Sequence, residues 1–523
     1  MSNSAYDTYT SPLASRNASA KMLTLWSARH KFNTWRRIWL AVAEAQHEVG
    51  LPVTKAQVEA LRAVVNRPGG ITDAEIGAAE KYERDLRHDV MAHVHALGDS
   101  CPEAKGIIHL GMTSQDVVCN ADVLHLRAAK QLIDRKTQRV MLSLGARAYD
   151  WKAIPALGYT HMQPAQPVTV GRRCAMWATE LDVIHRMMYE GSDSGWDRAL
   201  ALKGLRGATG TQASYLALFN GDSQKVEELE ARVQIKFGDC RNGLTVENVD
   251  WSNSDLAFDL TWANHRVVGQ TYPRIVDAIL LSNLASTAAV LHKIATDIRL
   301  LCNRKELDEP FETNQIGSSA MPYKRNPMRC ERICGLTRFV MNLVGNAYDT
   351  AATQWLERTL DDSSNRRLSL PEAFLALDGA LDLMHNVASG LIVHEAMVRK
   401  NLMAELPFMA TENILMACVQ RGGDRQHYHE LIRVHAQAAG TRVKDEGLDN
   451  DLLERLRADQ NFAAKSEGGA LTSALEWKNL LDPMKYIGRS IEQTERFIKD
   501  VIEPMRAQFA KELAEVDDTS PRV

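Results

Sequence analysis

An apolar stripe between residues 276 and 301 constrains the fold more than any other feature of the sequence. Hydrophobic side chains recur there every three or four residues, as on one face of a helix. The stripe consists of Ile279, Leu280, Leu284, Ala288, Leu291, Ile294, Ile298 and Leu301. It runs for about seven turns at 3.6 residues a turn. Residues 121–150 and 370–392 show comparable periodicity, whereas alternating strand patterns are hard to find. Long helices with short connectors predict an all-α bundle. Because a lone long helix buries little surface, a bundle built from several chains is plausible.

Turn-forming residues divide the chain into three parts. We expect an N-terminal helical domain over residues 1–113, a central long-helix domain over 114–368, and a C-terminal helical domain over 369–523. The central part holds the longest periodic segments. It is therefore expected to form the bundle.

Local signals mark where single helices begin and end. A helix is predicted over residues 328–346, because it starts directly after Pro327. Breaks are predicted at Arg67-Pro-Gly-Gly-Ile, at Leu406-Pro407 and at Arg421-Gly-Gly-Asp.

Composition narrows the class of protein. The chain has 523 residues, a formal net charge of -4 and 24% charged residues. This balance gives no global case for binding nucleic acid. No apolar run is expected to be long enough to span a bilayer, and no secretory signal is visible at the start. The eight cysteines are scattered without a Cys-x-x-Cys pair. Reduced thiols in a cytoplasmic protein are therefore expected, with no membrane partner.

The segment Gly317-Ser-Ser-Ala-Met-Pro-Tyr-Lys-Arg-Asn-Pro327 concentrates chemistry in a constrained loop. Gly317 permits backbone angles that other residues avoid. Pro322 and Pro327 restrict their own φ and bias the preceding residues away from helix. The loop carries two hydroxyls, a cation and an amide, which suits an anion-handling site with an oxygen base. A surface loop rich in turn formers is an equally good interpretation of the composition.

A second polar cluster is Arg87-His88-Asp89, followed by His93 and His95. The histidine spacings of five and two residues do not share a helical face, and no cysteine joins them. A metal site is therefore disfavoured. A charged triplet that binds substrate is favoured, and a salt-bridged helix start is the simpler alternative.

Three further segments are polar and rich in turn formers. His161, in the loop 160–167, could donate a proton near neutral pH, although a lone histidine is more often structural. Residues 207–214 lack the lysine of a P-loop and the G-x-G-x-x-G of a dinucleotide-binding turn, which excludes both folds. Residues 357–367 hold three arginines with serines, which suits a phosphate or carboxylate clamp. A solvated charged face is the alternative for this last segment.

Together these segments resemble the fumarase/aspartase superfamily, and the adenylosuccinate lyase family in particular. The loop 317–327 is similar to the superfamily pattern G-S-S-x-M-P-x-K-x-N-P, and its Tyr-Lys-Arg version resembles that family. The other matching segments, in the family's order, are 11–16, 87–93, 160–166, 207–214, 357–367 and 405–414. The resemblance implies a three-part all-α lyase fold and a homotetramer whose central helices form one bundle. It also implies active sites shared between subunits, with no metal and no organic cofactor.

The resemblance implies a reaction in purine biosynthesis. Fumarate is eliminated from adenylosuccinate, giving AMP, and from succinylaminoimidazole carboxamide ribotide, giving AICAR. Ser318 is implied as the base and His161 as the acid. Lys324 would help to activate Ser318, Glu331 would pair with a catalytic histidine, and His88 is a second candidate for the acid.

Other positions are implied as substrate contacts by the same match. The implied phosphate contacts are Arg16, Arg358, Ser363 and Arg367. The succinyl carboxylates are expected at Thr113, Ser114, Lys324 and Asn326. The remaining implied substrate-binding positions are Arg87, Asp89, Thr160, Gln270, Ser319 and Arg332.

The sequence departs from the family pattern in three places, one of them the segment Gln-Asp-Val-Val-Cys-Asn after Ser114, which looks closer to bacterial relatives. Asn17 stands where animal-type members are expected to have tyrosine, and residues 238–265 form a longer connection than usual. We interpret the longer connection as a tolerated insertion. Two alternatives to the family activity remain: another superfamily lyase, such as an argininosuccinate lyase, and a catalytically silent structural protein. The arginines of 357–367 argue against the first, and intact Ser318, His161 and Lys324 argue against the second.

Overall fold

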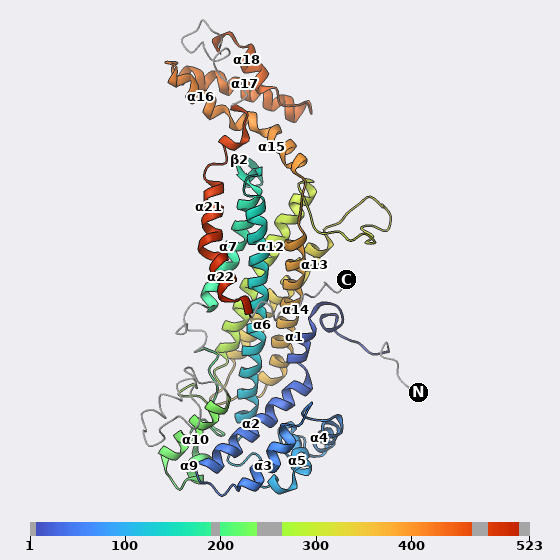
Figure 1. Cartoon of the computed structure of the whole chain (residues 1–523), viewed down its shortest axis with the longest axis vertical. Coiled ribbons are helices and arrows are strands. Elements are labelled where there is room, and N and C mark those ends of the chain that lie inside the picture. The colour runs from blue at the N-terminus through green and yellow to red at the C-terminus, as the bar shows by residue number, and fades with distance from the viewer. Residues whose placement is uncertain (1–6, 190–198, 238–263, 463–479, 512–523) are drawn as a thin grey trace.

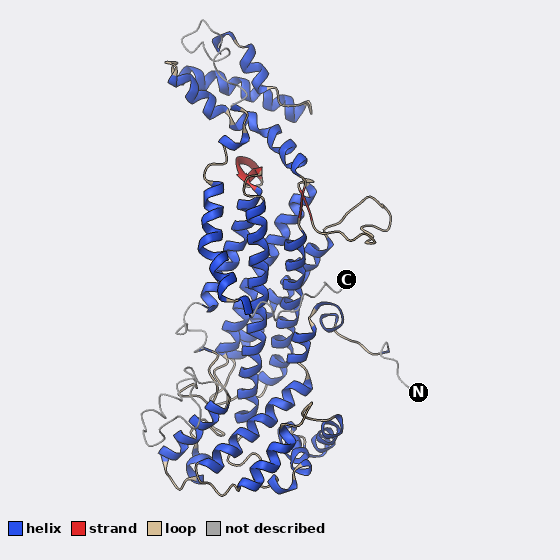
Figure 2. Cartoon of the chain, in the orientation of Figure 1, coloured by secondary structure: helices blue, strands red, loops and turns tan. Residues whose placement is uncertain are grey.

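The computed structural model describes residues 7–189, 199–237, 264–462 and 480–511. The molecule is elongated, and its longest helices run side by side along the long axis (Figure 1). Helices make up nearly all of its regular structure (Figure 2), which confirms the all-α fold. Most of the longer connection, residues 238–263, lies outside the described residues, so its interpretation as an insertion stays a prediction.

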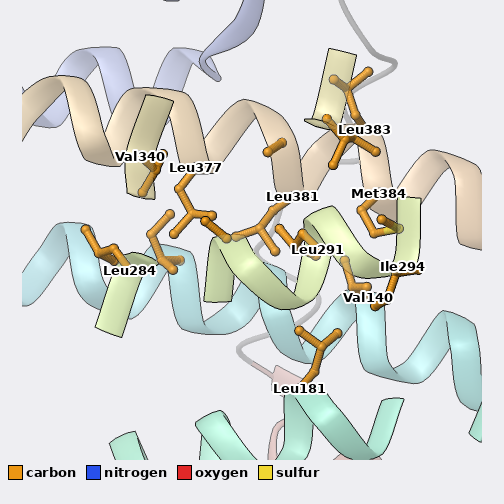
Figure 3. Packing of buried hydrophobic residues seen from close by; sticks show 14 of the residues in the cluster. Val140, Leu181, Leu284, Leu291, Ile294, Val340, Leu377, Leu381, Leu383 and Met384 are labelled. Atoms are coloured by element: carbon orange, nitrogen blue, oxygen red, sulfur yellow. The ribbon is translucent and has the colours of Figure 1, made fainter. Parts of the chain in front are cut away.

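Five long helices form the central bundle. Their bounds are α6 Ser114–Asp150, α7 Val170–Tyr189, α12 Ile275–Asn303, α13 Met328–Ala352 and α14 Asp362–Gly390. Figure 3 shows how they meet: Val140 of α6, Leu181 of α7, Leu291 of α12, Val340 of α13 and Leu381 of α14 interdigitate in one apolar cluster. The stripe predicted for α12 lines this core from Leu280 to Leu301, whereas Ile279, also predicted, is 37% exposed.

Helix α12 differs from one expectation. It is long and apolar enough to cross a membrane, as the bent pair α15–α16 would be if it were taken as one span. The expectation that no apolar run reaches such a length is therefore wrong for α12. The stripe of α12, from Leu280 to Leu301, is buried against the neighbouring bundle helices. Its composition is thus explained by its place in the bundle core.

The N-terminal helices pack around a second apolar cluster at the lower end of Figure 1. Their bounds are α2 Ala28–Glu48, α3 Lys55–Val65 and α5 Asp89–Ser100, with α4 Asp73–Leu86 packed on α5. The helices α9 Ala213–Leu218 and α10 Ser223–Lys236 join them. Helix α1 Ala20–Leu25, which precedes α2, packs instead on the central cluster through Met22. Capping boxes at Thr54 and Thr72 start α3 and α4. The predicted break at residue 67 is confirmed, and Gly69 and Gly70 adopt positive φ there.

The C-terminal helices form a smaller lobe and then return along the bundle. Their bounds are α15 Glu395–Met409, α16 Thr411–Gln420, α17 Arg425–Asp445, α18 Leu452–Ala458, α21 Ser490–Phe497 and α22 Glu503–Gln508. Pro407 lies inside α15, so the break predicted at 406–407 falls instead at Ala410. The break at residue 421 is confirmed, and Gly422 adopts positive φ.

The apolar clusters bear on the division into domains. Helix α14 runs through the expected boundary at residue 368 and packs in the central cluster. Residues 410–462 contribute a separate third cluster, whereas Ile502 and Met505 return to the central one. We propose that the third part begins after α14 and that its last helices belong to the bundle.

Two small sheets lie toward the upper end of the bundle (Figure 2). Strands β1 Pro155–Thr160 and β2 Gln163–Thr169 form an antiparallel hairpin. Strands β3 Leu307–Asp308 and β4 Ile392–Val393 pair Leu307 with Val393. At 1.5 Å rise per residue, the 37 residues of α6 span about 55 Å. Groups at the two ends of α6 are therefore far apart within one chain.

Candidate active site

The junction of α4 and α5 meets the start of α6 at the lower end of the bundle. Arg87 ends α4 in the left-handed region, with φ of 53°, which turns the chain so that His88 caps α5. The backbone N–H of Met91 donates to His88 Nδ1 (3.4 Å), so a neutral ring carries its proton on Nε2. That Nε2 lies 3.3 Å from the Oγ of Ser114, the first residue of α6. The ring proton of His88 thus points to a residue expected to bind a carboxylate.

Asp89 joins this junction to the start of α14. Its Oδ2 accepts from Arg367 Nη2 at 3.1 Å, and both side chains are partly exposed. Lys31 lies nearby, and burial lowers its pKa, with the charge of Arg367 lowering it further. No motif in the sequence singles out Lys31. Arg367 and Lys31 thus both lie near the Asp89 carboxylate.

Residues 270 and 358–363 form a compact guanidinium site. Arg358 Nη1 donates to Gln270 Oε1 (3.3 Å), and its Nη2 donates to Ser363 Oγ (3.1 Å) and Asp362 Oδ1 (3.2 Å). The other oxygen of Asp362 accepts from Arg274 at 2.7 Å. Two guanidiniums thus share one fully buried carboxylate beside the Ser363 hydroxyl. Such a site suits a phosphate or carboxylate ligand.

Asp116 holds the 207–214 turn against the start of α6. Its fully buried carboxylate accepts from the N–H of Thr113 (3.0 Å), the N–H of Gly207 (3.2 Å) and the hydroxyl of Tyr215 (2.9 Å), and it pairs with Lys203. Asp116, Lys203 and Tyr215 were missed from the sequence. The signal that could have found Asp116 is the capping box that it forms with Thr113, three residues earlier.

The segment 317–327 is a largely exposed loop before α13. Asn326 Nδ2 donates to the carbonyl of Gly317 (2.9 Å), and the N–H of Met321 donates to Ser318 Oγ (3.1 Å). A Cβ on Gly317 would lie 2.2 Å from the carbonyl oxygen of Lys324, so only glycine fits there. Ser319 and Lys324 are exposed. The loop thus presents two hydroxyls and an ammonium group to the surface of one chain.

Arg16 and Arg332 lie near one another beside the first turns of α13. Arg16 sits in a short π-helical turn, Leu13–Asn17, and is exposed. Burial lowers the pKa of Arg332, and the charge of Arg16 lowers it further. Two neighbouring guanidiniums that repel one another favour an anion between them. On the same helix, Glu331 Oε1 lies 3.9 Å from Arg299 Nη2. A histidine partner for Glu331 stays a prediction.

His161 lies at the tip of the β1–β2 hairpin. Thr160 pairs with Gln163, so His161 and Met162 form a two-residue turn, and both have positive φ, 53° and 59°. Such turns normally use glycine or asparagine, so two larger residues there store strain. His161 and Thr160 are exposed. The hairpin packs on α15 at the upper end of the bundle in Figure 1.

The histidines near residue 88 do not converge. His93 is buried and stacks on Phe32 at 3.8 Å, whereas His95 stacks on Tyr82 at 5.1 Å. His88 instead faces Ser114. His93 is thus a core residue, and the role of residues 87–89 in binding substrate stays a prediction.

Comparisons with known proteins define the family. A family model described as "Lyase" matches residues 15–197 and 209–342, and one described as "Adenylosuccinate lyase C-terminus" matches residues 407–497. The chain is 45% identical to the adenylosuccinate lyase of Saccharomyces cerevisiae, covering 97% of this chain and 98% of the relative. It is 46% identical to that of Schizosaccharomyces pombe, covering 98% of each.

The chain belongs to the adenylosuccinate lyase family.

Solved structures agree on the fold of this lyase. It matches a fumarate lyase from Mesorhizobium sp. BNC1 with a TM-score of 0.72 at 22% identity, covering 94% of this chain and 99% of that one. It matches the 3-carboxy-cis,cis-muconate lactonizing enzyme of Pseudomonas putida with a TM-score of 0.73 at 24% identity, covering 94% and 98%. At these identities the likeness concerns the fold.

The structure of this lyase gathers the predicted site residues into separate groups. His88, Asp89, Ser114 and Arg367 are joined by contacts at the lower end, where Arg358 lies four residues before the start of α14. His161 follows the opposite end of α6. The loop 317–327 precedes α13, whereas Arg358 follows it, so these two groups also lie at opposite ends of one helix. One chain therefore does not bring the predicted base, acid and phosphate clamp together.

Proposed function

We propose that this lyase eliminates fumarate from adenylosuccinate, leaving AMP, and performs the same elimination on succinylaminoimidazole carboxamide ribotide. The observation that carries the proposal is the Arg358 site, combined with the family of the chain. A guanidinium next to a serine hydroxyl and a glutamine suits the phosphate that both substrates carry. Argininosuccinate has no phosphate and would leave this group without a ligand.

The chemistry assigns a role to each predicted catalytic group. Ser318, as alkoxide, takes a proton from the carbon next to a succinyl carboxylate. The electron pair left behind forms the C=C bond of fumarate as the C–N bond breaks. The leaving nitrogen then receives a proton from His161, with His88 as the second candidate. Lys324 favours the ionised form of Ser318 and stabilises the charge that builds up on the carboxylate.

The remaining predicted residues would bind the substrate without taking part in proton transfer. Ser319 and Asn326 would bind a succinyl carboxylate from the loop 317–327, and Thr113 and Ser114 would bind one from the start of α6. The proposed phosphate ligands are Arg16, Arg358, Ser363 and Arg367. The other proposed substrate contacts are Arg87, Asp89, Thr160, Gln270 and Arg332. Glu331 would pair with a catalytic histidine.

We also propose that the site is completed by other copies of the chain, in a homotetramer. The length of α6, about 55 Å, supports this, because His88 and His161 lie beyond its opposite ends. An exposed apolar stripe on α7 supports it too: Met176, Val183 and Met187 are 42%, 54% and 64% exposed and recur at helical spacing. Light scattering of the purified protein would test the assembly, and a monomer with full activity would contradict it.

The test of the reaction is fumarate release from adenylosuccinate, with argininosuccinate in a parallel incubation. Release from adenylosuccinate alone supports the proposal, and a third incubation with the carboxamide ribotide tests the second reaction. Release from argininosuccinate alone would contradict the role given to Arg358. Release from neither, by a folded protein, would favour a silent structural homologue.

A further inference from the structure

Glu309 is a nearly buried carboxylate that the predicted site does not include. It lies directly after β3 and is 5% exposed. Its Oε1 accepts from the backbone N–H of Arg329 (2.9 Å), and its Oε2 accepts from the N–H of Cys330 (3.0 Å). Both groups belong to the first turn of α13. Burial raises the pKa of Glu309, while these two N–H groups act against that change.

Helix α13 depends on this side chain because its own N-cap residue contributes none. The N-cap is Pro327, which makes no side-chain capping bond. The first N–H groups of a helix need acceptors, and a carboxylate there also meets the positive end of the helix dipole. Glu309 thus caps α13 from 18 residues earlier in the chain.

The same contact closes the base of the signature loop. Arg329 donates back to the carbonyl of Pro310, so residues 309–310 are fixed to residues 329–330. The segment between Pro310 and Arg329 carries Ser318, Ser319, Lys324 and Asn326. Inside it, the bond from Asn326 to Gly317 and the close approach of Gly317 to Lys324 form a smaller closed ring. The orientation of the ring therefore depends on its base.

The residues just before Glu309 are themselves held in place by β4 and α15. β3 pairs with β4, and the N–H of His394 donates to the carbonyl of Glu306 at 2.9 Å. Asn401 Nδ2 donates to Glu306 Oε1 at 2.8 Å. Glu309 thus connects α13 to a backbone that α14 and α15 hold in place.

We propose that Glu309 is a positioning residue of the proposed elimination, which fixes the loop bearing Ser318 and Lys324 by capping α13 and closing the loop base. This inference rests on the proposed function for its kinetic consequence. Glu309 does not touch the substrate in this proposal. It sets where the base and the cation stand relative to a substrate that Arg358 and its neighbours hold from elsewhere.

The test compares Glu309→Ala with Glu312→Ala in the full-length protein. Glu312 pairs with the same Arg329 guanidinium, but its side chain is 73% exposed, and it accepts from no α13 backbone N–H among the described contacts. For Glu309→Ala, kcat on adenylosuccinate is expected to fall about 10- to 100-fold while KM rises less than about threefold. For Glu312→Ala both constants are expected to stay near those of the wild type.

Hydrogen exchange provides a readout that needs no substrate. In Glu309→Ala, exchange is expected to speed up in residues 311–330 and to stay unchanged in α12 and α14. Glu309→Gln retains one acceptor and should lie between the wild type and the alanine variant in both readouts, and it replaces the alanine variant if that protein does not fold. A folded variant with wild-type kcat and wild-type exchange in 311–330 would overturn the proposal. Faster exchange throughout the bundle would overturn it too, since the role would then be general stability. If the wild type fails to act on adenylosuccinate, the proposed function fails, while the exchange pattern still decides whether Glu309 anchors the loop.

Discussion

The two ends of the bundle hold their predicted site residues in different ways. At the lower end, Arg358, Asp89 and His88 each have a side-chain partner from another element of the same chain. At the signature loop, Ser318 accepts one N–H from its own loop, and Lys324 stands exposed. The lower end is therefore pre-organised in one chain. The orientation of the signature loop depends instead on the contacts at its base and on any group that packs against it.

This difference suits the two tasks in the proposed reaction. A binding group gains affinity when it is held rigid before the ligand arrives. A base and a cation must be placed to within a fraction of an ångström, but only relative to the bound substrate. Changes at Ser318 or Lys324 should therefore affect kcat, and changes at the lower end should affect binding or stability. Four predictions test this contrast.

The largest effect is expected from Ser318→Ala. Removing a general base lowers kcat by about 10²- to 10⁴-fold, while the affinity for adenylosuccinate should change little because the phosphate clamp is intact. Ser319→Ala is the matched control, since it deletes the neighbouring hydroxyl and should act mainly on KM. Single-turnover fumarate release and calorimetric binding measure both quantities. Unchanged turnover in Ser318→Ala would remove Ser318 from the role of base.

Asp116→Asn tests the rigid end. Lys203 and Asp116 form an ion pair in which both side chains are fully buried, so neutralising the aspartate leaves a buried ammonium group without its counter-charge. The free energy of unfolding should fall by about 3–5 kcal/mol. The double variant Asp116→Asn/Lys203→Met should recover part of this loss. Urea unfolding of the three proteins provides the measurement, and equal stability of wild type and Asp116→Asn would show that the network is not needed.

Much of this architecture was readable from the sequence, because long helices leave a strong periodic signal. The stripe at 276–301 became α12, and the segment after Pro327 became α13. The hairpin with His161 was not predicted, since prolines at 155, 164 and 167 interrupt the alternation that marks a strand. The hairpin also packs on α15, and that contact between distant segments leaves no local signal in the sequence.

The site was only partly readable, for a related reason. Arg358 and Ser363 are close in sequence, so their contact could be expected, but Gln270 reaches Arg358 through a backbone bond to Glu357 at 3.0 Å. Glu309 acts on residues about twenty positions later, at a spacing that matches no local motif. Contacts between distant segments leave no periodic trace in one sequence. The family resemblance named the residues, and the structure supplied their grouping.

Arg358→Met should have a smaller effect than the first two changes, and one limited to binding. Losing a charge-assisted contact to phosphate costs about 1.5–3 kcal/mol, so the affinity for AMP should fall about 10- to 100-fold. Arg358→Lys keeps the charge but loses the planar guanidinium geometry, and it should bind AMP with intermediate affinity. Inhibition by fumarate should be the same in all three proteins. If AMP binds Arg358→Met as tightly as wild type, the phosphate lies elsewhere.

The smallest expected effect is a loss of stability at acidic pH, which should appear first in the helices at the lower end. Burial lowers the pKa of His93 and of His109 to about 4, from 6.5 in an unfolded chain. The unfolded state therefore binds more protons between these values. The stability from each neutral ring is fully present above pH 6.5 and is lost as the pH falls toward 4, with about 1 kcal/mol lost per histidine at pH 5.5.

Both histidines pack with the N-terminal helices, whereas the segment 309–331 contains no histidine. Hydrogen exchange at pH 5.5, corrected for the intrinsic pH dependence, should thus accelerate in residues 28–110 more than in α12–α14. In His93→Phe the loss of unfolding free energy from pH 7.5 to 5.5 should be about 1 kcal/mol smaller than in the wild type. At pH 7.5 and above, the unfolding free energies of the wild type and of His93→Phe should depend on pH in the same way. If the two proteins also lost the same free energy between pH 7.5 and 5.5, His93 would not be held neutral by burial.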